Sequence, residues 1–496
     1  MQKLVASLSK YGAFFPFLYA LAAGLYPIVY YYSKNFTLVA TWRHLGYFAL
    51  IYIGIPFLCL LIAQQLIKKG VFGKYGKYVL PFINLSFFFV LILLTMKGIL
   101  LKKLSVGLIC LAALMVFFLY KHFKKWVLLQ LLLAGVSLVW LVPQLVNYAS
   151  ISEDWKKQPD AIASTVLKSK PNIYFIQPDG YVNFSELRQG AYGIDPSTFQ
   201  NYLTAQNFVH YPNTHSNYPS TLTSNSATFM MKHHYYEGKE YFKEMPRTRE
   251  VIVSDNTVLE VLKNNGYQTN LLIELPYFML SRPQMGYDFC NFSYTEVSPI
   301  GTGLGKPRDV LPVLQDLLNK ESQQPQFYFI EVFAPGHIRG AKSLSKGKEK
   351  EKEIWLEDLD AANERLTGLI DAINSKDPNA LIIMLADHGG FVGLDYTAQY
   401  QTKTQERDII YSMFSANLSI KWPQEAPTEL APYFKSNVNV FRVLFSHLAN
   451  DPVLLENLQP DTSYVPMREQ PGVDENGIYE YIDDSGGIVF KKVRGF

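Results

Sequence analysis

Four side chains in three short motifs could form a metal site. Asp179 precedes Gly180 directly after one apolar run, Asp387 and His388 follow a second run, and His337 follows a third. A carboxylate beside an imidazole suits a divalent cation such as zinc or manganese, with magnesium as the alternative. Each motif alone is common as a turn, but their joint occurrence after three apolar runs predicts a metal site.

A fourth motif could supply a nucleophile. Residues 215–224 are rich in hydroxyl groups, are interrupted by Pro219, and lead into an expected helix at 222–231. A hydroxyl at a helix N-terminus lies at the positive end of the helix dipole, which favours a developing alkoxide, and a bound metal ion would activate it further. The same residues also fit a Ser or Thr that only caps the helix, so this stretch alone leaves both roles open.

The elements that must position these motifs alternate along the chain. β-rich apolar runs are expected as buried strands, with helix-like stretches between them. This alternation predicts an α/β domain with a mostly parallel sheet, whose ligands bind beyond the carboxyl ends of the strands. The charged run 341–353 is expected to be a solvated loop that leads into a helix. The expected strands are 172–177, 268–273, 326–333, 380–386 and 409–414, and the expected helices are 256–265, 308–320 and 353–374.

The first third of the chain has the composition of a membrane domain. Residues 1–152 contain 14 Lys or Arg and no Asp or Glu, whereas the rest of the 496 residues hold 32 basic and 43 acidic side chains. The acidic remainder argues against nucleic acid as a partner, and the basic, apolar first third argues against a cytosolic enzyme. Five apolar stretches are each close to the ~20 residues that cross a bilayer. They are 11–33, 44–67, 78–101, 104–123 and 126–146.

The basic residues predict the orientation of these five spans. Nine lysines precede the first span or lie after the second and fourth, and five basic residues lie at the opposite ends. Because cytoplasmic loops carry the excess of Lys and Arg, the N-terminus is expected in the cytoplasm and everything after residue 150 outside it. The expected organisation is a transmembrane domain at 1–150, a linker at 151–170 and an extracytoplasmic domain at 171–496.

Taken together, the order of Asp179, Thr221 and the pair Asp387-His388 resembles the alkaline phosphatase/sulfatase superfamily. Behind five spans, the chain resembles the membrane-anchored transferase branch, which includes lipoteichoic acid synthases and lipid A phosphoethanolamine transferases. The resemblance implies a five-helix transmembrane bundle followed by an alkaline-phosphatase-like (sulfatase-like) α/β domain in a bacterial-type inner membrane. It also implies that Asp179, Thr221, Asp387 and His388 bind one metal ion, that Thr221 is the nucleophile and that His337 contacts the transferred phosphoryl group or the leaving oxygen.

The sequence departs from the superfamily pattern around Pro219. Sulfatases carry Cys or Ser two residues before a Pro-Ser-Arg triplet, and Asn217 stands at that place here, which disfavours a formylglycine-type sulfatase. The register near Pro219 leaves Ser220 as an alternative nucleophile. The pair His233-His234 is expected on the surface, and a second metal ion stays undecided. Residues near the motifs that are interpreted as structural are Tyr181, Glu274, Glu331 and Arg339.

The implied function is metal-dependent transfer of a phosphoryl-linked headgroup, of the phosphoethanolamine or phosphoglycerol type. The donor would be a membrane phospholipid, the acceptor a cell-envelope glycan or lipid, and the intermediate a phosphorylated Thr221. Two alternatives use the same residues differently. A membrane-anchored sulfatase or phosphodiesterase would use water as the acceptor, and a catalytically inactive relative would only bind its partners.

Overall fold

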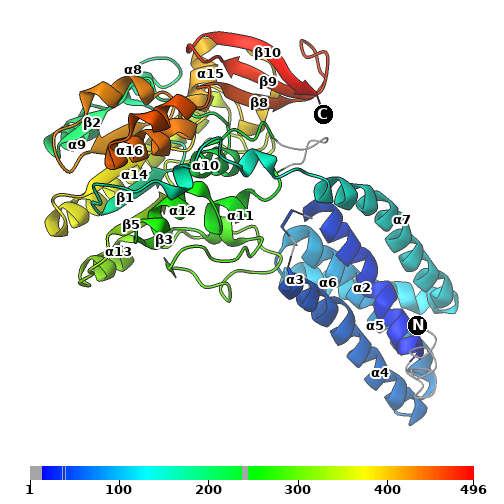
Figure 1. Cartoon of the computed structure of the whole chain (residues 1–496). Coiled ribbons are helices and arrows are strands. Elements are labelled where there is room, and N and C mark those ends of the chain that lie inside the picture. Colours follow the sequence, from blue (N-terminus) through cyan, green and yellow to red (C-terminus); the bar gives the residue numbers. More distant parts are fainter. Residues whose placement is uncertain (1–13, 36, 39–40, 237–243, 496) are drawn as a thin grey trace. The chain divides into compact units, whose positions relative to one another are not determined.

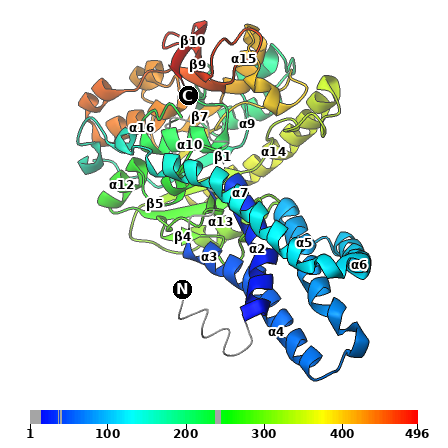
Figure 2. The ribbon, with the colours of Figure 1, turned by 90° about the vertical axis from the view of Figure 1, so that its right-hand side faces the viewer.

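The chain divides into two units (Figures 1 and 2). The computed structural model describes residues 14–35, 37–38, 41–236 and 244–495. The first unit comprises the helices up to residue 150 and two short segments, Leu280–Arg282 and Val297–Gly303. The second unit comprises the other residues from Ile151 onward and contains all the described strands.

The first unit is a bundle of apolar helices. Four stretches are long and apolar enough to cross a membrane, namely Phe14–Asn35, Trp42–Lys68, Gly73–Lys97 and Lys102–Lys156. The helices within them are α2 (Phe14–Asn35), α3 (Trp42–Phe48), α4 (Ile55–Lys68), α5 (Gly76–Lys97), α6 (Lys102–Leu119) and α7 (Phe123–Ala149).

The last of the four stretches covers two of the five spans expected from the sequence. The short 3-10 turn Tyr120–His122 separates α6 from α7 there, so the fourth and fifth expected spans fall on different helices. A π-helical turn, Ala49–Gly54, joins α3 to α4 within the second stretch. Residues 11–13 of the first expected span lie outside the described residues.

Polar side chains inside the bundle connect three of its helices. Asn84 on α5 and Gln130 on α7 exchange amide hydrogen bonds of 3.2 and 3.0 Å. Asn84 also donates to the carbonyl of Tyr19 on α2 at 2.8 Å. Both amides are buried, and buried polar groups away from water need such partners. The pairing therefore fixes how α2, α5 and α7 face one another.

The second unit is built on a seven-stranded, mostly parallel sheet of order β2-β7-β6-β1-β5-β3-β4. Among the described strands, β7, second from the edge, breaks the parallel arrangement, because it runs antiparallel to both of its neighbours, β6 and the edge strand β2. The strands are β1 (Ile173–Pro178), β2 (Phe208–His210), β3 (Gln268–Ile273), β4 (Phe289–Cys290), β5 (Gln326–Val332), β6 (Leu381–Leu385) and β7 (Leu418–Lys421). β1, β5 and β6 are buried throughout, as expected where helices cover both faces.

Alternating residues of β1 face two layers of helices. The helices are α8 (Phe184–Arg188), α9 (Ser197–Ala205), α10 (Thr221–Met230), α11 (Thr248–Val253), α12 (Thr257–Asn264), α13 (Leu311–Leu318), α14 (Lys348–Lys376), α15 (Arg407–Phe414) and α16 (Val440–Ala449).

The ring of Phe175 on β1 contacts Phe229 of α10 and Phe441 of α16, with centroids 5.8 and 5.1 Å apart. Gln177, two residues later, exchanges hydrogen bonds with Asn225 of α10. The carboxyl end of β1 therefore faces α10.

The structure corrects one expected strand. Residues 409–414 belong to α15, and the strand that follows is β7. Ile409, Ile410, Met413 and Phe414 are buried, and their spacing suits one face of a helix as well as a buried strand. A small antiparallel sheet near the C-terminus was not expected (Figure 1). It consists of β8 (Ser463–Met467), β9 (Gly477–Ile482) and β10 (Ile488–Gly495).

Residues 151–170, expected to form a linker, pack into the second unit. Trp155, Ile162 and Leu167 are buried there. Asp160 accepts a hydrogen bond from the buried Arg442 guanidinium on α16 at 2.6 Å. Two short 3-10 turns, Asp154–Lys156 and Ile162–Ser164, carry Trp155 and Ile162.

Candidate active site

Asp179 is held at the end of β1 by backbone contacts with β5 and the loop after it. Its N–H donates to the carbonyl of Val332 at 2.9 Å, and the N–H of Gly336 donates to its carbonyl at 2.8 Å. The next residue, Gly180, has φ of +67°, and a Cβ there would lie 2.0 Å from the carbonyl oxygen of Gly336. Only glycine fits this close approach, so Gly180 lets the ends of β1 and β5 meet.

Asp387 and His388 follow β6 and face Asp179. Asp387 Oδ1 accepts hydrogen bonds from the backbone N–H of Gly180 at 3.1 Å and of His388 at 2.9 Å. His388 Nδ1 donates to the carbonyl of Gly389 at 2.8 Å, which leaves Nε2 as the ring nitrogen that faces the carboxylates. Nε2 lies 3.3 Å from Asp387 Oδ2 and 3.6 Å from Asp179 Oδ1.

The geometry distinguishes Thr221 from Ser220. Thr221 is the first residue of α10, and its Oγ1 lies 3.2 Å from His388 Nε2. The hydroxyl of Ser220 instead lies 2.8 Å from Thr223 Oγ1. The Thr221 hydroxyl therefore faces the two carboxylates and the imidazole, at a helix N-terminus whose dipole favours negative charge.

These residues fit a divalent cation. Asp179, Asp387 and His388 each offer a ligand atom, and these atoms all lie within 4.8 Å of one another. Asp179 Oδ1 and Asp387 Oδ2 are buried and have no hydrogen-bond partner among the described residues. Buried polar atoms without protein partners are rare in folded proteins, and such atoms suit the binding of an ion. Mixed nitrogen and carboxylate ligands suit zinc or manganese.

The electrostatics of the cluster favour added positive charge. Burial and the neighbouring Asp387 carboxylate raise the pKa of Asp179. Burial alone would lower the pKa of His388, but Asp387 and Asp179 together offset it and leave that pKa above its usual value. Both shifts mean that the cluster takes up positive charge, as protons or as a metal ion.

Glu331 of β5 extends this acidic cluster. It is fully buried, and neither of its carboxylate oxygens has a hydrogen-bond partner among the described residues. Burial, followed by Asp179 and Asp387, raises its pKa well above the usual range. It pairs in register with Gln177, so it faces α10 as Gln177 does. The sequence alone favoured a structural role for Glu331, and the feature that could have indicated its place in the cluster is an acidic residue inside the apolar run 326–333.

His337 lies on the loop after β5 and is exposed. Its Nδ1 donates to the carbonyl of Ile338 at 2.7 Å and lies 3.1 Å from Thr397 Oγ1, which leaves Nε2 free. The ring centroids of His337 and His388 are 6.2 Å apart. His337 is thus beside the cluster but open to a substrate.

The expectation that His233 and His234 form a surface pair is wrong, because both side chains are buried. His233 bonds Tyr218 and the carbonyl of Pro460, and His234 Nε2 donates to the carbonyl of Thr223 at 2.9 Å. Burial lowers the pKa of both rings, to about 4 and about 3. They are neutral packing residues that support α10.

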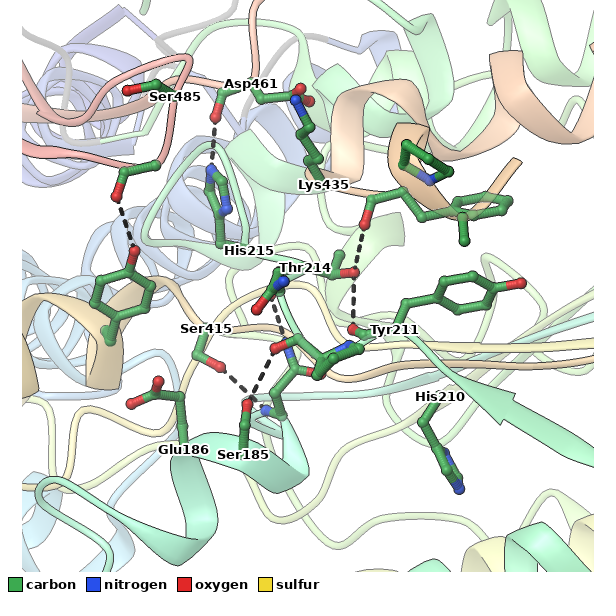
Figure 3. A pocket seen from close by; sticks show the side chains of 18 of the residues that line it. Ser185, Glu186, His210, Tyr211, Thr214, His215, Ser415, Lys435, Asp461 and Ser485 are labelled. Carbon is green, nitrogen blue, oxygen red and sulfur yellow. Dashed lines mark hydrogen bonds between the residues drawn. The ribbon is translucent and has the colours of Figure 1, made fainter. Parts of the chain in front are cut away.

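A cavity of about 700 Å³ lies elsewhere in the second unit (Figure 3). Thr214 and His215 form part of its wall, together with the ion pair of Glu186 and Arg407. Thr214 donates to the carbonyls of Tyr211 and Phe434, so much of the polar lining is bonded within the protein. Among the described residues, the lining includes neither Thr221 nor the three groups of the metal cluster.

The chain has a weak similarity to several solved structures. The chain is similar to the C-terminal periplasmic domain of EcEptC from Escherichia coli in complex with Zn, with 14% identity and a TM-score of 0.40, over 57% of this chain and 85% of that one. It is also similar to the integral membrane protein lipooligosaccharide phosphoethanolamine transferase A (EptA) from Neisseria meningitidis, with 13% identity and a TM-score of 0.39, over 86% of this chain and 95% of that one.

No curated protein sequence matches the chain. The sulfatase family model matches residues 184–449, which is more than half of the 496 residues. The matched region contains Thr221, His337, Asp387 and His388, and Asp179 lies just before it. On this match, the protein belongs to the sulfatase family.

Proposed function

We propose that the protein is a membrane-anchored phosphotransferase. It moves a phosphoryl-linked headgroup, of the phosphoethanolamine or phosphoglycerol type, from a membrane phospholipid to a cell-envelope glycan or lipid. The observation that carries this proposal is the Thr221 hydroxyl, 3.2 Å from His388 Nε2 beside two unpartnered carboxylate oxygens. A sulfatase-family domain with such a nucleophile, behind apolar helices, suits a substrate that stays in the bilayer.

The proposed topology has five spans in a bacterial-type inner membrane. α6 has 18 residues and α7 has 27, so each is long enough to cross on its own. The excess of lysines before the first span and after the second and fourth supports a cytoplasmic N-terminus. With five spans, the domain from 171 onward is extracytoplasmic, where lipid headgroups and envelope glycans are exposed.

We assign Asp179, Asp387, His388 and Thr221 as the residues that hold a divalent cation. A bound cation supplies positive charge that lowers the pKa of the Thr221 hydroxyl and neutralises phosphoryl oxygens. The bond from His388 Nδ1 to the Gly389 carbonyl fixes the tautomer that presents Nε2. The N-terminus of α10 adds its dipole at the same place.

Thr221 carries the group between donor and acceptor. Its Oγ1 attacks the phosphorus of the lipid phosphodiester, the bond from phosphorus to the diacylglycerol oxygen breaks, and that oxygen takes up a proton as diacylglycerol leaves. An acceptor hydroxyl then attacks the same phosphorus, the bond to Thr221 breaks, and the acceptor's proton returns to Thr221. His337 Nε2, left free by the Nδ1 hydrogen bond, is the atom that passes a proton to and from the reacting oxygens.

A hydrolase is the second candidate, and the family match favours it. A membrane-anchored sulfatase or phosphodiesterase would use the same residues and give the group on Thr221 to water. Asn217 occupies the place where sulfatases carry the Cys or Ser that they convert to formylglycine. This departure favours phosphoryl over sulfuryl substrates.

The test is lipid turnover by the full-length protein. The purified protein is reconstituted in vesicles with a phospholipid whose acyl chain is fluorescent, and the release of diacylglycerol is measured with and without envelope lipids. Transfer is supported if the release of diacylglycerol is lost in Thr221→Ala, is kept in Ser220→Ala and increases when an acceptor lipid is present. Turnover of soluble nitrophenyl esters without a lipid donor supports the hydrolase. No turnover despite bound metal ion supports the inactive relative.

A further inference from the structure

A pocket of about 380 Å³ lies among the helices of the first unit. Three of the residues that line it are lysines: Lys77 near the start of α5, and Lys121 and Lys124 around the turn between α6 and α7. All three are exposed. The apolar part of the lining consists of Tyr19, Ile67, Leu80, Pro81 and Phe123. The pocket therefore combines concentrated positive charge with an apolar wall.

The chain contains nothing nearby in sequence that could neutralise this charge. No Asp or Glu occurs before Glu153. Lys77 Nζ lies 5.0 Å from the ring centroid of Tyr78 and 4.8 Å from that of Tyr120. These cation–π contacts hold the ammonium group in place without cancelling its charge. Further lysines occur in the same two connections, namely Lys68, Lys69, Lys74 and Lys125.

We propose that this pocket binds the headgroup of an anionic phospholipid. The ends of membrane-spanning helices lie at the level of lipid headgroups, and basic pockets between such helices bind anionic lipids. Ammonium groups of Lys77, Lys121 and Lys124 would donate to the phosphate, and the apolar wall would contact the glycerol and upper acyl carbons. Such a lipid would join α2, α4, α5 and α7. The proposal is independent of the phosphotransfer assigned to the second unit.

The experiment compares lipid binding by charge variants of the full-length protein. Dioleoyl phosphatidylglycerol and dioleoyl phosphatidylcholine are the probes, and the number of lipids retained is measured by native mass spectrometry from detergent. Wild type should bind phosphatidylglycerol in preference to phosphatidylcholine. The triple variant Lys77→Gln, Lys121→Gln, Lys124→Gln should lose on the order of 100-fold in affinity for phosphatidylglycerol, since each lysine near a headgroup contributes about fivefold.

A matched variant removes the same charge elsewhere in the bundle. Lys97→Gln, Lys102→Gln, Lys103→Gln changes three lysines at the other ends of α5 and α6 and should keep the wild-type preference. The triple variant Lys77→Arg, Lys121→Arg, Lys124→Arg keeps the positive charge and should also keep the preference for phosphatidylglycerol. This control separates the loss of charge from a loss of folding. The proposal is overturned if both glutamine variants lose affinity equally, or if wild type does not distinguish the two lipids.

Discussion

Removal of the metal ion should make the stability of the second unit fall as the pH rises. Because Asp179 is buried beside Asp387, its pKa is raised from 3.8 to about 7 in the folded protein. Between about pH 4 and pH 7 the unfolded chain has lost this proton while the folded protein keeps it, so rising pH favours unfolding. The difference between the two pKa values corresponds to about 4 kcal/mol. The pKa values of His388 and Glu331 are also raised, and both shifts act in the same direction.

The assay follows thermal unfolding of the full-length protein in detergent after treatment with a chelator. From pH 5 to pH 7.5 this difference lowers the stability of the folded protein by about 2.5 kcal/mol. At about 2 °C per kcal/mol, the Tm of the metal-free protein should fall by about 5 °C over this range. Asp179→Asn should remove much of this fall, and Asp474→Asn, at an exposed site, should keep it. Saturating zinc should reverse the slope, because protons compete with the metal ion for the same atoms. A metal-free Tm that does not fall, or that falls equally in Asp179→Asn, would contradict the raised pKa of Asp179.

Three further predictions concern the same edge of the sheet. Gly180→Ala should lower the Tm by more than Gly193→Ala does. Both glycines have positive φ, which costs about 1–2 kcal/mol for alanine, but only a Cβ at 180 would meet the backbone, at 2.0 Å. Equal losses of Tm in the two variants would contradict the close approach of β1 and β5. His388→Ala should abolish metal binding measured by elemental analysis, and a full metal content would contradict its place in the cluster. His337→Ala should keep the metal content and lower the turnover number by about 10²- to 10⁴-fold; unchanged turnover would exclude a role in proton transfer.

The strands that carry the motifs were predictable because they are apolar and fully buried. The runs expected at 172–177, 326–333 and 380–386 correspond to β1, β5 and β6, and the three motifs lie just beyond their carboxyl ends. The strand β7 was missed because it has four residues and alternates apolar with polar side chains. The expected strand at 409–414 is helical because its apolar residues also fit a helix period.

The sequence predicted which residues form the candidate site, but it did not predict which of their side chains contact one another. The sequence favoured Thr221 and left Ser220 as an alternative nucleophile, and the path of the chain into α10 shows which hydroxyl lies near His388. The environment of Glu331 was hidden for a related reason. Its burial beside Asp179 depends on the pairing of β1 with β5, a contact between residues that are far apart in the sequence.

Peptide-level mass spectrometry of residues 211–232, in protein purified from native-like membranes, tests whether Thr221 forms the proposed covalent intermediate. We expect an adduct of phosphate with ethanolamine or glycerol on Thr221, absent from Thr221→Ala and retained in Ser220→Ala. That result would identify the reaction class and the donor together. The same adduct on Ser220 would contradict the assignment of the nucleophile. An unmodified peptide from wild type that turns over lipid donor would contradict the covalent mechanism.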